Sequence, residues 1–382
     1  MQKKTELVVP LFVPDLGEPE SRAVLACLES EWLAMGPRCE AFENAFSSFL
    51  GSRYSVSVSS CTAALHLAVK VLDIGEGDEV IVPSLTFAAT ANAVAYCGAT
   101  PVFGDVKSVD DWTIDPDAIE ALITENTKAI IVMHYGGFPC DMDRILAIAH
   151  KHSLLLIEDA CHGLGGSING QSMGTIGDIG CFSFYSNKVM TTGEGGMLVT
   201  NSATIRERLV RLRSHGMTAG AYDRMKGAMG YDIEEIGYNY RLDDIRAAVG
   251  IAQLDRLKDS VTKRRNLVSM YMDNLAKVEG ISVPLHGSRG GPAHYIFPIL
   301  LDRGINREEV RNKMLMSGVQ TSMHYPPAHL FTHYRKSTQK LPVTEDIAER
   351  LITLPLFPKL TESQVQTVCS MLDQAIKAER GN

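Results

Sequence analysis

One lysine of this sequence is separated from every other lysine and arginine and lies among aromatic, hydroxyl and glycine residues. Lys188 follows the aromatic, β-prone stretch 182–187 and precedes the glycine turn 193–196. Its nearest lysine or arginine neighbours are Lys151 and Arg206. This pattern fits an exposed loop lysine, or a desolvated one whose lowered pKa leaves a neutral amine at pH 7. In the second case Lys188 could form a Schiff base with a carbonyl group.

Two acids and a histidine follow a short apolar run. Residues 154–157 are Leu-Leu-Leu-Ile, and Glu158, Asp159 and His162 come shortly after them. An apolar run without alternation is typical of a parallel strand that is covered on both faces. Ligands of open α/β sheets bind outside the carboxyl ends of such strands. Asp159 could therefore hold a cationic group of a ligand, or it could cap the next turn.

Small polar residues lead into a helix rich in alanine and leucine at residues 59–66, which read Ser-Ser-Cys-Thr-Ala-Ala-Leu-His. The start of a helix has free N–H groups and about half a positive charge, which suits a phosphate group. Serine and threonine are also ordinary helix caps. This segment alone leaves a phosphate site and a simple cap as alternatives.

The three segments together match the chemical parts of pyridoxal 5′-phosphate, which has a phosphate, a pyridine nitrogen and an aldehyde. The helix start at 59–66 would bind the phosphate, Asp159 would pair with the protonated ring nitrogen, and Lys188 would form the imine. A carboxylate at that nitrogen keeps the ring an electron sink. We therefore predict pyridoxal 5′-phosphate as the cofactor and no metal.

Alternating strands and helices are needed to bring these segments to one edge of a sheet, and the sequence predicts them. Apolar runs at 79–82, 129–133 and 154–157 predict buried strands, and residues 141–152 predict a helix between the last two. Strands separated by helices are typical of βαβ units and a mainly parallel sheet. The expected fold class is α/β.

The character of the sequence changes near residue 255, which predicts a second domain. A chain of 382 residues is long enough for two or three domains. Beyond a long amphipathic helix predicted from Leu257 to Leu275, proline becomes more frequent and buried-strand runs become rarer. We expect a large α/β domain at residues 1–255 and a smaller α+β domain at 256–382. The first 30 residues or so could pack on the smaller domain.

Composition and missing motifs exclude several classes of protein. The formal net charge is −8, which argues against nucleic acid as a partner. No apolar run is long enough to span a bilayer and no signal peptide is indicated, so we expect a cytoplasmic protein without a membrane partner. Walker and dinucleotide-binding glycine motifs are absent. Residues 170–174 fit G-x-S-x-G, but Asn169 and Gly170 predict a hairpin instead of a nucleophile elbow.

Three further motifs are the runs 83–87 (Pro-Ser-Leu-Thr-Phe), 237–241 (Gly-Tyr-Asn-Tyr-Arg) and 324–327 (His-Tyr-Pro-Pro). Together with the segments above, their order resembles the DegT/DnrJ/EryC1/StrS family from about Pro10 to the last helix. These are pyridoxal-phosphate-dependent sugar aminotransferases of fold type I, the aspartate-aminotransferase-like fold. The resemblance implies a mixed, mainly parallel sheet in the large domain. It also implies a homodimer with shared active sites.

The resemblance implies roles for the matching residues. The expected catalytic residues are Lys188, which would carry the cofactor and shuttle a proton, Asp159 at the pyridinium nitrogen, and His162 near the cofactor's 3-oxygen. Phe87 would stack on the ring, and Asn239 would reach the phosphate of the neighbouring subunit. The remaining residues would hold the phosphate or line the substrate side: Ser183 and the backbone of Cys61 and Thr62 at the phosphate, and Arg241, His324 and Tyr325 toward the substrate.

The resemblance further implies a reaction. An amino group would pass from L-glutamate to the keto group of a nucleotide-linked deoxyhexose, at C3 or C4. A cyclitol ketone such as an inosose is an alternative acceptor, and a non-catalytic cofactor-binding regulator is a more distant alternative. Cys61 stands where the family usually has glycine or alanine, and the run before Lys188 also departs from the usual pattern. These departures leave the nucleotide and the sugar open.

Overall fold

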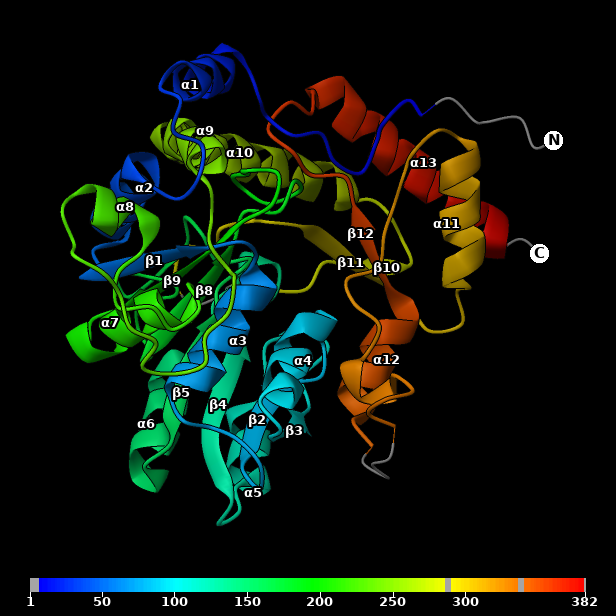
Figure 1. Cartoon of the computed structure of the whole chain (residues 1–382). Coiled ribbons are helices and arrows are strands. Elements are labelled where there is room, and N and C mark those ends of the chain that lie inside the picture. Colours follow the sequence, from blue (N-terminus) through cyan, green and yellow to red (C-terminus); the bar gives the residue numbers. More distant parts are fainter. Residues whose placement is uncertain (1–6, 286–289, 336–339, 381–382) are drawn as a thin grey trace.

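The main layer of the protein is a seven-stranded sheet (Figure 1). The structure is a computed structural model that describes residues 7–285, 290–335 and 340–380. Only β9 runs antiparallel to its neighbours, and the four strand pairs from β8 to β3 are parallel. This confirms the α/β class and the mixed, mainly parallel sheet. In spatial order the strands are β1 (Tyr54–Val58), β9 (Gly196–Thr200), β8 (Ile179–Ser183), β5 (Leu155–Asp159), β4 (Thr127–Met133), β2 (Glu79–Pro83) and β3 (Thr100–Gly104).

Helices cover both faces of this sheet, which explains the continuous apolar runs of the strands. Along β2, Val80 and Val82 pack on one face, whereas Ile81 packs on the other. The first face is covered by α3 (Cys61–Val71), α4 (Ala88–Tyr96) and α7 (Ala203–Leu212). The second is covered by α5 (Pro116–Leu122) and α6 (Met142–His152), and by α2 (Pro37–Leu50) near β8 and β9. The three predicted strands and the predicted helix at 141–152 are all present.

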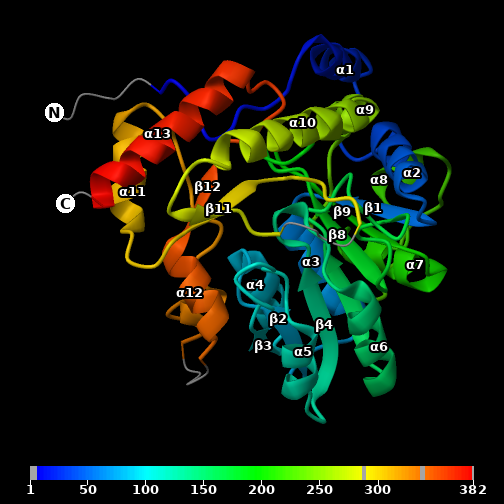
Figure 2. The ribbon, with the colours of Figure 1, turned by 180° about the vertical axis from the view of Figure 1, so that it is seen from behind.

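A layer of helices crosses the carboxyl side of the sheet (Figure 2). It consists of α9 (Asp244–Asp255) and α10 (Leu257–Leu275), with α1 (Glu18–Glu29) packed on α9. The predicted long amphipathic helix is thus present as α10, and all of its predicted apolar positions between Leu257 and Leu275 lie within it. Leu257 and Val261 of α10 pack in the same core as α2 and β8. Its residues from Leu267 onward pack in a separate core.

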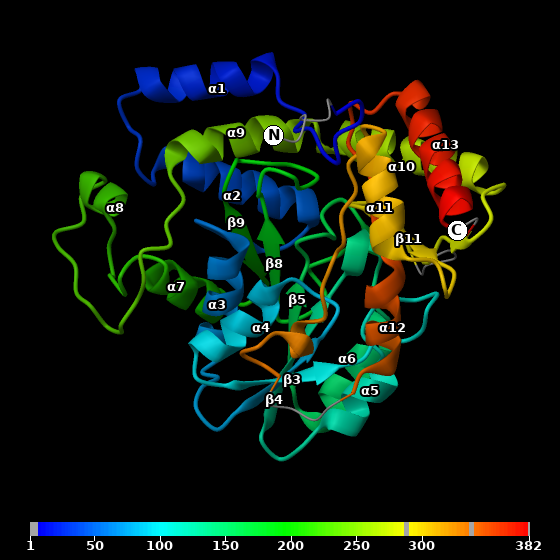
Figure 3. The same cartoon turned by 90° about the vertical axis from the view of Figure 1, so that its right-hand side faces the viewer.

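That separate core belongs to the C-terminal part of the chain. Its antiparallel sheet has the order β10 (Ile281–Ser282), β11 (Phe297–Leu301) and β12 (Leu351–Leu354). The sheet packs against α10, α11 (Arg307–Met316) and α13 (Glu362–Arg380), and α12 (Pro342–Arg350) precedes β12 (Figure 3). Residues near the N-terminus join this part, because Val9 forms a parallel bridge with Val319.

A two-stranded hairpin replaces the nucleophile elbow that G-x-S-x-G would require. It consists of β6 (Ser167–Ile168) and β7 (Gln171–Ser172), joined by Asn169 and Gly170. Both turn residues have positive φ angles, 49° and 84°, as a type I′ turn requires. This confirms the predicted hairpin. The other short helices are α8 (Ala221–Met225), η1 (Tyr135–Gly137) and η2 (Ala328–Leu330).

Within the described ranges, none of the helices combines the length and the apolar character that crossing a bilayer requires.

Candidate cofactor site

The site lies where neighbouring strands of the large sheet end. Asp159 is the last residue of β5 and Ser183 is the last residue of β8, the strand paired with it. The turn after β8 carries Lys188, and the turn after β5 carries His162. The carboxyl ends of parallel strands form the usual ligand edge of an open α/β sheet. The fold thus brings the predicted catalytic residues to one edge.

Asp159 is buried and held by two donors. Thr90 Oγ1 on α4 donates to Oδ2 at 2.8 Å, and the backbone N–H of Cys161 donates to Oδ1 at 3.3 Å. The bond from Cys161 is the turn cap that the sequence left open, so Asp159 caps the turn while it also faces the site. Thr90 was missed by the sequence reasoning, although Thr86 and Thr90 are one helical turn apart and their hydroxyls lie 2.7 Å from each other.

Lys188 is half-buried, and its Nζ lies 4.2 Å from the centre of the Tyr295 ring. Burial lowers the pKa of the Lys188 ammonium, but nearby groups that favour the positive charge outweigh it and raise the pKa above its usual value. These groups are Tyr295, Cys161, Cys61 and Asp159. The lowered pKa that the sequence left as one alternative is therefore not found in the cofactor-free chain, because the sequence did not show which side chains surround the lysine.

His162 is neutral and tied to Tyr325. The backbone N–H of Gly136 donates to Nδ1 at 3.3 Å, so the proton of the neutral ring is assigned to Nε2, which lies 3.0 Å from the Tyr325 hydroxyl. Burial holds the pKa of His162 well below its usual range, and Lys188 and His324 add to the effect. The structure thus joins a predicted catalytic residue to a predicted substrate residue.

His324 lies near the same group. Burial, with Lys188 as a second cause, lowers the pKa of His324 to about 4. Its Nδ1 lies 3.0 Å from the hydroxyl of Thr353 on β12, and its carbonyl oxygen accepts a hydrogen bond from Tyr135. Two parts of the fold therefore hold the 324–325 segment against the site.

The start of α3 presents free backbone amides. The Ser60 hydroxyl accepts from the N–H of Ala63 at 3.1 Å, and the Ser60 carbonyl accepts from Ala64 at 3.0 Å. The amides of Cys61 and Thr62 precede the intrahelical pattern and can serve a ligand. The Cys61 thiol also contacts the thiol of Cys161 beside Asp159. The helix start and the strand end are therefore adjacent.

Gly196 makes this approach possible. A Cβ at this first residue of β9 would lie 2.5 Å from the carbonyl carbon of Ser60 and 2.8 Å from the amide nitrogen of Cys61. Non-bonded atoms do not approach a Cβ this closely, so any side chain at position 196 would displace the start of α3.

The remaining predicted residues are less closely grouped. Ser183 is buried, whereas Phe87 is 56% exposed and its ring centre lies 5.8 Å from that of Tyr325. Asn239 is exposed on a segment that bridges to Ser214. The side chain of Arg241 donates to the Ser214 hydroxyl at 3.1 Å.

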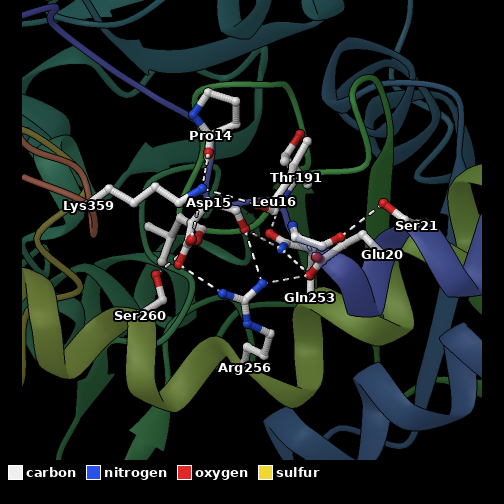
Figure 4. A network of polar contacts seen from close by, with 12 residues as sticks. Pro14, Asp15, Leu16, Glu20, Ser21, Thr191, Gln253, Arg256, Ser260 and Lys359 are labelled. Atoms are coloured by element: carbon white, nitrogen blue, oxygen red, sulfur yellow. Dashed lines mark hydrogen bonds and ion pairs between the residues drawn. The ribbon is translucent and has the colours of Figure 1, made fainter.

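A polar network lies behind the Lys188 turn (Figure 4). The side-chain oxygen of Gln253 accepts from the N–H of Thr191 at 3.3 Å, and Ser260 donates to the carbonyl of Val189 at 3.3 Å. The amide nitrogen of Gln253 donates to Glu20 at 2.7 Å. The network ties the turn to α9, α10 and the N-terminal segment. No local pattern predicted it, because its members are far apart in the chain. It is completed by Asp15, Arg256 and Lys359.

Comparison with known proteins shows which family has this sequence and fold. The sequence model of the DegT/DnrJ/EryC1/StrS aminotransferase family matches residues 14–373. The chain belongs to this family. It is a pyridoxal-phosphate-dependent aminotransferase, which confirms the predicted resemblance, fold type and enzyme class.

Individual relatives of the aminotransferase match over nearly their whole length. GDP-perosamine synthase of Escherichia coli O157:H7 is 38% identical over 96% of this chain and 98% of its own. The spore coat polysaccharide biosynthesis protein SpsC of Bacillus subtilis is 36% identical over 99% of both chains. The solved PLP form of Spr1654, a proposed sugar aminotransferase of Streptococcus pneumoniae, is 29% identical with a TM-score of 0.90, over 97% of this chain and 99% of that one.

The residues of the aminotransferase fit pyridoxal phosphate. The free amides of Cys61 and Thr62 suit the phosphate, and Asp159 suits the pyridinium nitrogen. Lys188 has the primary amine that forms an imine with the aldehyde. Gly196 keeps the phosphate end open. In the described ranges, no group of three or more His, Cys, Asp or Glu residues is arranged to hold a metal ion.

Proposed function

We propose that this aminotransferase moves the amino group of L-glutamate to the keto group of a nucleotide-linked deoxyhexose, at C3 or C4. One curated relative is named as a GDP-perosamine synthase and another for spore coat polysaccharide biosynthesis, which supports a sugar substrate. The observation that carries the proposal is the meeting of Lys188, Asp159 and the start of α3 at one sheet edge.

Lys188 is the proposed base and acid. Bound pyridoxal phosphate supplies an electron sink for the charge that develops on the substrate carbon. Lys188 Nζ would remove the proton from that carbon and deliver it to C4′ of the cofactor, since the amine would be free once substrate had replaced it on the cofactor. Asp159 would accept a hydrogen bond from the ring nitrogen, and Thr90 keeps that carboxylate in place.

Aromatic and histidine side chains would surround the cofactor ring. Phe87 would stack on it, a contact worth about 0.5–1.5 kcal/mol beyond burial. The neutral His162 would approach the 3-oxygen, and its bond to Tyr325 would fix the orientation of the imidazole. His324 and Tyr325 would line the substrate side, where burial, with Lys188 as a second cause, lowers the pKa of His324 to about 4.

A second copy of the chain would complete the site. Asn239 is exposed and is proposed to reach the phosphate bound by the partner, with Arg241 near the substrate. Large apolar side chains are exposed on and after α8, which projects from the body of the chain in Figure 3. Exposed apolar patches of this kind typically mark protein–protein contacts. These side chains support a homodimer with shared active sites. The exposed apolar residues are Met225, Met229, Tyr231, Ile233 and Ile236.

Borohydride reduction of the loaded enzyme tests the site. We expect a stable adduct on Lys188, located by peptide mass spectrometry, and none in Lys188→Ala, which should bind the cofactor without a covalent bond and show no turnover. An adduct on another lysine would refute the assignment of the site.

A panel of acceptors tests the substrate. With L-glutamate as donor, mass spectrometry should detect amino products from nucleotide-linked keto sugars. Turnover of an inosose without turnover of any nucleotide sugar would favour the cyclitol alternative. Failure of glutamate to convert the cofactor to its amine form would favour the non-catalytic regulator.

A further inference from the structure

Tyr295 reaches from the C-terminal part of the chain to the Lys188 turn. It lies two residues before β11 and is buried, with 4% of its surface exposed. Its N–H donates to the carbonyl of Gly136 at 2.9 Å, and its own carbonyl accepts from Arg264 at 3.1 Å. The backbone of Tyr295 is therefore fixed from two sides.

The Tyr295 side chain contacts three residues of the site. Its ring centre lies 4.2 Å from Lys188 Nζ, and its hydroxyl donates to the side-chain oxygen of Asn187 at 3.0 Å. The same ring packs on the imidazole of His162, with the ring centres 4.1 Å apart and an angle of 31° between the planes. One side chain thus contacts the lysine, the residue before it and the histidine.

These contacts act on the charge as well as the position of the lysine. The face of an aromatic ring carries partial negative charge and attracts an ammonium group, more strongly where water is excluded. Lys188 is half-buried, and the Tyr295 ring beside it is 4% exposed, so both groups have lost part of their contact with water. The Tyr295 ring therefore replaces part of the hydration that the ammonium loses.

We propose that Tyr295 is a positioning residue for Lys188, with its ring holding the ammonium and its hydroxyl holding the turn through Asn187. The inference rests on the proposed role of Lys188, but the contacts exist without the cofactor and are tested without it. Because the ring favours the ammonium over the amine, Tyr295 also shifts upward the pH at which Lys188 becomes a nucleophile.

Other groups from several elements also face Lys188. They are Asp159 at the end of β5, Cys161, His162, Cys61 on α3 and His324. One of them, His162, packs on the Tyr295 ring, so variants that keep a ring at position 295 separate the charge of the ring face from a change at His162.

The test labels Lys188 of the full-length, cofactor-free protein with trace acetic anhydride at a series of pH values and quantifies its peptide by mass spectrometry. Tyr295→Leu should lower the midpoint of labelling by about one pH unit, which is roughly tenfold in proton affinity. Tyr295→Phe keeps the ring face and should stay within about 0.3 pH unit of the parent. Tyr185→Leu, at an exposed tyrosine of the same turn, is the matched control and should not shift the midpoint.

A fluorinated series keeps the proposal testable if Tyr295→Leu does not fold. Phenylalanine with one, two or three fluorine atoms at position 295 keeps the shape while it weakens the charge on the ring face. The midpoint should fall stepwise along the series, which a packing role would not cause. A flat series, or an unchanged midpoint in a folded Tyr295→Leu, overturns the proposal. Absence of a borohydride adduct on Lys188 of the loaded parent would refute the proposed function but leave this result intact.

Discussion

The raised pKa of Lys188 bears on how the proposed cofactor would be taken up. Only the unprotonated amine attacks an aldehyde. Since the surroundings raise the pKa of Lys188, the reactive fraction is small at neutral pH and grows with pH. We expect the rate of cofactor uptake by the cofactor-free chain to rise about tenfold per pH unit from pH 7 to 9. Stopped-flow absorbance measures it, and a rate independent of pH in this range would contradict the raised pKa.

Asp159 depends on Thr90 for its position, which predicts a graded effect of two substitutions. Asp159→Asn should fold normally and lose most activity, because an amide does not keep the ring nitrogen protonated. Thr90→Val removes the hydroxyl that bonds Asp159 and contacts Thr86, without changing the shape of the side chain, so we expect a smaller loss in kcat of roughly tenfold, as for about 1–1.5 kcal/mol. Steady-state kinetics and thermal melting of both variants check this order. Equal losses in the two variants would show that Thr90 does more than hold the carboxylate.

At the scale of elements, the proposed phosphate site depends on how closely β9 and α3 approach each other. The start of α3 lies against the first residue of β9, and only glycine at position 196 permits this contact. The paired strand β1 leads into α3, so the sheet fixes the helix start from two strands. A displacement of a few tenths of an ångström there would move the amides that are proposed to hold the phosphate.

Gly196→Ala tests this contact. The added methyl group must push back the backbone of Ser60, so we expect a loss of stability of about 1–3 kcal/mol and weaker cofactor binding. Gly75→Ala is a matched control, because its Cβ would meet only the carbonyl of Cys97 at an ordinary 3.6 Å. Thermal melting and cofactor titration of both variants measure the difference. Unchanged cofactor affinity in Gly196→Ala would separate this contact from the phosphate site.

Local patterns were enough to predict several of the elements. The apolar runs that became β2, β4 and β5, and the hairpin at Asn169, each depend on a few consecutive residues. Thr90 and Tyr295 were not predicted, because their contacts arise only when distant parts of the chain fold together. The sequence left the charge of Lys188 open for the same reason. Roles that need the cofactor or a second chain, such as that of Asn239, remain predictions.

At the scale of the whole molecule, buried histidines couple the stability of the fold to pH. Burial lowers the pKa of His324 and of His294 to about 4, with nearby positive charges as further causes. The usual value is about 6.5, so between pH 6.5 and 4 the unfolded chain binds more protons than the folded one. Stability must therefore fall as the pH falls through this window.

The expected size of this effect is on the order of 1–2 kcal/mol for each of the two histidines at pH 5 relative to pH 8. Urea unfolding of the cofactor-free protein at both pH values measures it. His294→Gln should reduce the difference by the share of one histidine, since glutamine does not titrate. A chain equally stable at pH 5 and pH 8 would show that these imidazoles are not buried as described.

The exposed apolar side chains after α8 have a consequence for handling the enzyme. If a second copy covers them, folding and association are linked, and heat resistance depends on how much protein is present. Serial dilution should then lower the melting temperature and, near the dissociation constant, remove activity in proportion to the single chains that form. Assays at very low enzyme concentration would thus underestimate its turnover.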